Sequence, residues 1–310
     1  MTDLRNDEQY RNMIKRIKGS CLLALPQSAA KILELSRNPE NGPPEFAKAI
    51  ASDVGLTSQI LRFVNSSYFG FRNKVTTIRA ALSLVYGRTI KNFILWNAVF
   101  ALLPNPKCGP FMLKTLCQDS VRRGVFAKVF AEYFPELDSE ELFICGLFQD
   151  IALPILAQNW PEEYESILNR RQNEYRRISD LEQEIFGWNH ALAGAYLVEE
   201  WGFDEEIAEV VTDHIQPSFD IDPNHCSTAE LRRIIVSLSA LLPSIVDETW
   251  DEADRFFSAY FRFHLPGIPK PDELFIRIEE NVADLLKLSK LGSSKNLLPE
   301  FHKKWLETLE

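Results

Sequence analysis

The stretch RTIKNFILWNAVFALL, residues 88–103, carries apolar side chains on nearly every face of a helical wheel. A helix that is apolar all round is expected to be buried inside a protein. The next segment, residues 104–110, contains three prolines and a glycine, which cannot continue a helix. Together the two segments predict a buried helix that ends at the boundary between two helical regions.

The rest of the chain shows helical spacing of its apolar residues and almost no alternation of the strand type. Prolines or capping side chains precede several apolar segments, at Pro26, Pro43, Thr57 and Thr77. Three capping boxes are predicted to begin at Asp138, Ser179 and Ser227. The fold class is therefore expected to be all-α and multi-helical.

The composition narrows the class of partner. The net charge of −10 over 310 residues weighs against nucleic acid, which needs a concentrated basic surface. No apolar run is long enough to span a bilayer, so membrane insertion is not expected. Five cysteines without a C-x-x-C pair favour a reduced, cytoplasmic setting. Four adjacent arginine pairs are interpreted as solvated helix faces, at Arg122-Arg123, Arg170-Arg171, Arg176-Arg177 and Arg232-Arg233.

Acidic and imidazole side chains occur at three places in helix-like segments: Gln149-Asp150, His190 and Asp213-His214. Asp150 is either a metal ligand or a hydrogen-bonded core carboxylate, and the second reading is favoured. His190 is expected to be a buried neutral histidine that joins two helices. His214 is expected to act as a cationic cap at a helix C-terminus, where it would contribute about 0.3–1 kcal/mol. No metal ligand set is assigned.

A second polar cluster comprises Asp53, Asn65 and Ser66. Asn and Ser are unfavourable inside the apolar helix expected here, because their side chains compete for backbone hydrogen bonds. The cluster is either a contact for a ligand or partner, or a polar knot that fixes helix packing.

These motifs occur in an order that resembles the HDOD family, the HD-related output domains of bacterial signalling proteins. The resemblance runs from about Ile14 to Pro217. It rests on Leu25-Pro26, Ala51-Ser52-Asp53, the stretch ILRFVNSSYFG at 60–70, IRAALSL at 78–84, Gly87, Glu182, FGWNHA at 186–191, Gly194-Ala195, Trp201 and His214. Two positions differ from the family pattern. Val54 stands where the family usually has proline, and Val85-Tyr86 stands where it usually has leucine before the glycine.

The resemblance implies a relation to the HD phosphohydrolases, whose metal site uses an early histidine, a His-Asp pair and later histidines. In this chain the early histidine would fall near Gln118-Asp119, where there is none, and the His-Asp pair is replaced by Gln149-Asp150. Of the histidines, only His190 and His214 remain. The resemblance therefore implies a non-catalytic bacterial regulatory module with a degenerate HD site. It would act by binding a signalling protein, with a link to cyclic nucleotides as one option.

The expected organisation is a helical lobe at 1–105, an HD-like lobe at 106–227 and a helical extension at 228–310. No cofactor is expected. Two alternatives stay open. One is a metal-dependent phosphohydrolase that uses Asp150, His190 and His214. The other is a sensor that binds nucleotides without hydrolysing them.

Overall fold

The computed structural model describes residues 8–19, 25–38, 40–66, 69–85, 87–106, 108–109, 111–174, 176–216, 220–263, 267–293 and 296–309. These residues form helices, with one isolated β-bridge between Cys108 and Phe111. The predicted all-α class is confirmed. Among the described residues, no helix is both long and apolar enough to cross a bilayer. Ser67, Tyr68, Tyr86 and Pro217, used in the resemblance, lie outside the described residues.

The contacts within the chain divide it into two units. The first unit contains α1 (Glu8–Gly19), the described residues of 103–279 and α17 (Leu297–Glu307). The second contains α2 to α6 and residues 280–293. This grouping places residues 228–279 in the same unit as residues 106–227, the expected HD-like lobe. The division into 1–105, 106–227 and 228–310 stays a prediction.

The second unit contains five helices of the N-terminal half: α2 (Gln27–Ser36), α3 (Pro43–Ala51), α4 (Val54–Val64), α5 (Ile78–Leu84) and α6 (Gly87–Leu102). As expected, α6 is buried along most of its length, and its Phe93 ring stacks on Phe63 of α4 with centroids 3.9 Å apart. Thr77 caps α5 through its side chain, as predicted. The helix expected to start at Thr57 begins instead at Val54, because the Asp53 carboxylate accepts a hydrogen bond from the Leu56 N–H.

Asn65 does not lie inside a helix, contrary to the prediction, since α4 ends at Val64 and Asn65 is its C-cap. Its side-chain amide donates to the Val75 carbonyl and accepts from the Val75 N–H, both at 2.7 Å. Asn65 therefore fixes the backbone of the loop that precedes α5. The Ser66 hydroxyl is buried without a hydrogen-bond partner in the described part of the chain.

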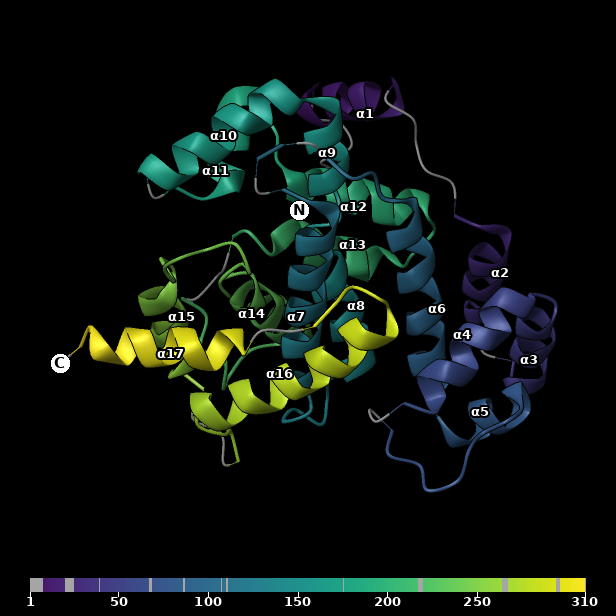
Figure 1. Cartoon of the computed structure of the whole chain (residues 1–310). Coiled ribbons are helices and arrows are strands. Elements are labelled where there is room, and N and C mark those ends of the chain that lie inside the picture. Colours follow the sequence, from purple (N-terminus) through teal and green to yellow (C-terminus); the bar gives the residue numbers. More distant parts are fainter. Residues whose placement is uncertain are drawn as a thin grey trace. The chain divides into compact units, whose positions relative to one another are not determined.

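The first unit is built around α7 (Leu113–Ala131) and α8 (Ser139–Phe148), which pack against each other (Figure 1). The helices that follow in this unit are α9 (Leu153–Asn159), α10 (Pro161–Glu174), α11 (Ile178–Phe186), α12 (His190–Glu200), α13 (Glu205–Asp213), α14 (Thr228–Ser239) and α15 (Ala253–Tyr260). α16 (Pro271–Leu288) contributes its residues up to Glu279. The caps predicted at Asp138 and Ser227 are confirmed.

Two glycines set the distance between α7 and α8. A Cβ on Gly146 would lie 2.8 Å from the Arg123 carbonyl oxygen, and a Cβ on Gly124 would lie 2.9 Å from the Phe143 carbonyl oxygen. Both distances are below normal van der Waals contact, and the opposing atoms belong to the backbone, so a side chain at either position would force the helices apart. The close approach holds Arg123 of α7 near the turn that follows α8, where Asp150 lies.

Candidate functional site

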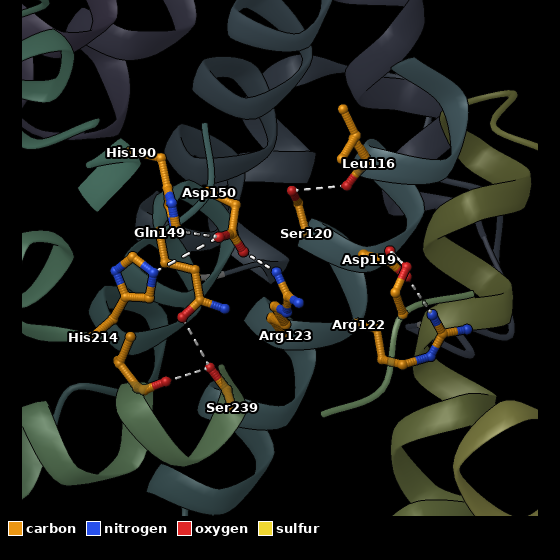
Figure 2. Close-up of polar contacts among 12 residues, drawn as sticks. Leu116, Asp119, Ser120, Arg122, Arg123, Gln149, Asp150, His190, His214 and Ser239 are labelled. Carbon is orange, nitrogen blue, oxygen red and sulfur yellow. Dashed lines mark hydrogen bonds and ion pairs between the residues drawn. The ribbon is translucent and has the colours of Figure 1, made fainter. Parts of the chain in front are cut away.

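Asp150 is the centre of a buried polar cluster in the first unit (Figure 2). It follows the C-cap of α8, Gln149, and its side chain is 11% exposed. Asp150 Oδ1 lies 3.2 Å from His190 Nε2 and 3.7 Å from His214 Nε2. The structure therefore brings together Asp150, His190 and His214, three of the four positions that the sequence interpretation assigned to a degenerate HD site.

Each imidazole is oriented by a hydrogen bond on its other ring nitrogen. His214 Nδ1 lies 2.6 Å from the Val211 carbonyl oxygen, which can only accept, so Nδ1 carries the proton. His190 Nδ1 lies 2.6 Å from the Glu182 carboxylate, which also accepts from the Tyr164 hydroxyl and the His190 N–H. The Nε2 atoms of both rings then face Asp150 Oδ1, and a second hydrogen bond on the other ring nitrogen is typical of histidines that ligate metals.

Burial keeps the His214 ring neutral. Its side chain is 1% exposed, and desolvation together with the charge of His190 lowers the pKa of His214 well below its usual value. The predicted cationic cap is therefore wrong, although Nδ1 does bond a carbonyl of the last turn of α13. The desolvation cost of a buried imidazolium exceeds the gain of about 0.3–1 kcal/mol from a helix C-terminus.

Arg123 supplies a positive charge that the sequence interpretation missed. Its guanidinium Nη1 donates to Asp150 Oδ2 (Figure 2), and its side chain is only 17% exposed. The prediction of a solvated arginine face is wrong for Arg122 and Arg123, which turn into the protein from α7. It also fails for Arg177, which is 20% exposed. Arg170 and Arg176, by contrast, pair with carboxylates at the surface.

Gln149 precedes Asp150, at the position where the resemblance implies a histidine. The residue is fully buried, and its Oε1 accepts a hydrogen bond from the Ser239 hydroxyl at 3.3 Å. Its Nε2 has no hydrogen-bond partner among the described residues. The single proton of the Ser239 hydroxyl also faces the Val236 carbonyl oxygen at 2.7 Å, so the contact with Gln149 is the weaker of the two. Gly194 of α12 packs closely here: a Cβ on it would lie 3.3 Å from Val211 Cγ1 and 3.6 Å from the Gln149 carbonyl oxygen.

Glu182 was predicted to belong to a capping box that begins at Ser179, and this prediction is wrong. α11 begins at Ile178 with Arg177 as its N-cap, so Glu182 lies within the helix and is fully buried. Its two oxygens join Tyr164 of α10 to His190 of α12. One sequence signal favours the buried role of Glu182 over a capping role. Glu182 lies eight residues before His190, on the apolar face of an amphipathic helix.

A metal ion would find suitable donor spacing but an unsuitable charge at this cluster. One donor atom from each of Asp150, His190 and His214 lies within 4.8 Å of the others. Such a set could hold a divalent ion with open positions for water. However, the Arg123 guanidinium already neutralises Asp150, and Gln149 offers only a weak amide ligand. The residues therefore do not fit a metal ion while Arg123 keeps this position.

Asp53, Asn65 and Ser66 all belong to the second unit, whereas Asp150 belongs to the first. Asp53 and Asn65 have local structural partners in the form of a helix cap and a loop backbone. Their role as ligand or partner contacts stays a prediction.

Several known proteins are similar to this chain. A protein from Treponema pallidum (strain Nichols), described as uncharacterized, is 24% identical over 196 residues. The match covers 61% of this chain and 37% of that relative. The chain thus spans little more than a third of the length of this curated relative.

Two crystal structures share the fold. An HDOD domain protein of unknown function from Geobacter sulfurreducens aligns with a TM-score of 0.63 and 18% identity, over 97% of this chain and 94% of that one. A protein from Marinobacter aquaeolei VT8, named for signal transduction, aligns with a TM-score of 0.68 and 17% identity, over 94% of this chain and 68% of that one. The model of the HDOD domain matches residues 22–217, and the chain therefore belongs to the HDOD domain family.

Proposed function

We propose that this protein is a non-hydrolytic regulatory module in which an arginine replaces the metal ion of an HD-type site. The observation that carries the proposal is the ion pair between Arg123 and Asp150. The guanidinium is a permanent cation, so it neutralises the buried carboxylate without supplying a Lewis acid or a bound water. The histidines and Gln149 then serve to pack α8, α12, α13 and α14 together.

A second candidate function is supported by the orientation of the two imidazoles. Their protonated Nδ1 atoms point to Glu182 and Val211, so both Nε2 atoms converge on Asp150 Oδ1. This arrangement favours a metal-dependent phosphohydrolase if Arg123 can leave Asp150. A metal bound there would supply an activated water for attack on a phosphoester.

Metal content and hydrolysis separate the two functions. Protein purified without a chelator is expected to contain no stoichiometric iron, manganese or zinc, and to leave a broad panel of phosphoesters intact. Gln149→His alone is expected to stay inactive, because Arg123 still bonds Asp150 and no histidine occupies position 118 or 119. Near-stoichiometric metal that is lost in Asp150→Ala, together with turnover of any panel member, would establish the second function instead.

We further propose that the output of the module passes through a signalling protein bound by the second unit. The contacts we assign to that protein are two apolar side chains in solvent, Val54 of α4, which is 82% exposed, and Leu84 of α5, which is 55% exposed. A photocrosslinking residue placed at 54 or at 84 is expected to capture the same protein in cells of the source organism. Met112, which is 52% exposed in the first unit, is the control position. Adducts at 54 and 84 that match those at 112 would count against this docking region.

A further inference from the structure

Exposed basic side chains follow one another from α4, through residues 69–77, to the start of α5 in the second unit. The chain contains 44 Asp and Glu residues, yet residues 54–118 contain none. The exposed cations of α4, α5 and the loop between them, which we call the basic surface, are Arg62, Arg72, Lys74 and Arg79. Their positive charge contrasts with the net charge of −10 for the whole chain.

The basic surface has no countercharge in the described part of the chain. None of its four side chains forms an ion pair or a hydrogen bond with a described residue. The surface arginines of the first unit differ, because Arg170 and Arg176 both pair with Glu184. A solvated helix face typically carries charges of both signs. Ordinary solvation of a helix face therefore does not explain a stretch that carries only one sign.

Helix stability explains one of these charges at most. Arg62 lies in the last turn of α4, where a cation interacts favourably with the helix dipole. Arg79 lies in the first turn of α5, where a cation is unfavourable. Arg72 and Lys74 lie outside both helices. The other three charges therefore have no stabilising role inside the unit and are available to a ligand outside it.

The loop that carries Arg72 and Lys74 is anchored to the core of the unit. Phe71 is 37% exposed, and its ring stacks on Phe69 with centroids 5.9 Å apart. Phe69 in turn contacts the buried Phe63 edge to face at 4.9 Å. A loop held in this way presents its charges at fixed positions, so a partner pays little to order it.

The neighbouring apolar side chains favour a protein over the other anions. A nucleic acid supplies phosphate charge but no aliphatic side chains for Val54 and Leu84, which are exposed on the same two helices. A membrane-binding helix inserts a continuous apolar face. α4 and α5 instead bury their apolar faces within the protein. A polypeptide offers carboxylates and aliphatic groups together.

We propose that the basic surface binds an acidic segment of a partner protein. This inference rests on the proposed docking of a signalling protein by the second unit, and it adds the charge of that protein. Complementary charge of this kind raises the rate of association and selects against basic partners.

Fluorescence anisotropy of a labelled peptide of glutamate and leucine, titrated with the full chain, tests this inference. Saturable binding is expected, and it should weaken as potassium chloride is added, because salt screens exposed charges. Arg72→Glu combined with Lys74→Glu is expected to weaken binding at least about tenfold, which corresponds to ~1.4 kcal/mol. Both side chains are exposed in a loop, so this variant should fold.

Two controls isolate the sign and the place of the charge. A peptide with glutamine in place of glutamate should not bind. Lys31→Glu combined with Lys48→Glu makes the same change of charge at exposed positions of α2 and α3, and it should leave binding within about twofold. Equal weakening by the two double variants, or no binding of the glutamate peptide, would overturn the inference. Tighter binding of oligothymidylate or of phosphatidylglycerol vesicles, with the same dependence on Arg72 and Lys74, would also overturn it.

Photocrosslinking separates this inference from the proposed docking. A crosslinker at position 54 is expected to lose its adduct when Arg72 and Lys74 are reversed, and to keep it in the Lys31 and Lys48 control. An adduct that the reversal leaves unchanged would overturn the acidic character of the partner and leave the docking itself intact. Adducts at 54 and 84 that match those at 112 would instead overturn the docking, even if the glutamate peptide binds.

Discussion

Arg122→Met is expected to lower the free energy of unfolding by about 3–5 kcal/mol, because it leaves buried carboxylates without their countercharge. Arg122 is 1% exposed, and its Nε donates to Glu279 Oε1 at 2.7 Å while its Nη1 lies 3.5 Å from Asp119 Oδ1. Both carboxylates are also nearly fully buried. Urea denaturation followed by circular dichroism measures the loss.

Other hydrogen bonds make this cluster a link between α7 and the C-terminal segment. Asp119 accepts from the Ser244 hydroxyl and from the Ile245 N–H, and Glu279 accepts from the Leu298 N–H at 3.3 Å. Three parts of the segment beyond the family match are therefore joined to one turn of α7. The next residue on that turn is Arg123, so the same helical turn links the C-terminal segment to the Asp150 cluster.

Two comparisons identify the cause of the Arg122 effect. Arg170→Met, on an arginine that is 29% exposed, is expected to cost less than about 1 kcal/mol, because exposed ion pairs contribute little. Adding Glu279→Gln to Arg122→Met is expected to cost less than the sum of the two single changes, since it removes one of the unpaired charges. Equal losses for Arg122→Met and Arg170→Met would refute the buried-charge account.

The sequence predicted those parts of the fold that depend on local patterning. The buried helix at 88–103, the caps at Thr77, Asp138 and Ser227, and the all-α class follow from helical periodicity and from capping chemistry. Two predicted helix starts were wrong: the Asp53 side chain caps α4, whereas α11 begins after Arg177 without any side-chain cap. Asp53 precedes Thr57, and Arg177 precedes Ser179, and the earlier residue became the N-cap in both cases.

The site was predictable only in part, because its partners come from distant segments. The sequence identified Asp150, His190 and His214, and their convergence followed from the family resemblance. It did not predict Arg123 or Glu182, since a charged side chain on a helix is normally solvated and only tertiary packing shows otherwise. Gly124, next to Arg123, was the available signal: a glycine inside a helix indicates a close approach by another backbone.

Arg123→Met is expected to destabilise the protein by about 3–5 kcal/mol at neutral pH and to create a metal-binding site. The substitution leaves the Asp150 carboxylate facing two imidazoles with no cation nearby on α7. Zn²⁺ or Mn²⁺ can then bind among Asp150 Oδ1 and the two Nε2 atoms, because the cation that neutralised the carboxylate through Oδ2 is gone. Thermal unfolding with and without added metal measures the effect.

The metal should restore stability to the variant and not to the native chain. A ligand that binds only the folded state stabilises it by about 2.7 kcal/mol at a concentration of about 100 times its Kd. The matched control is Arg123→Met combined with Asp150→Asn, which lacks both the guanidinium and the carboxylate. This double variant should lose less stability than Arg123→Met and should gain none from metal. If added metal raised the unfolding temperature of the native chain as much as that of Arg123→Met, Arg123 would not stand in for the metal ion, and the metal-dependent function would be favoured.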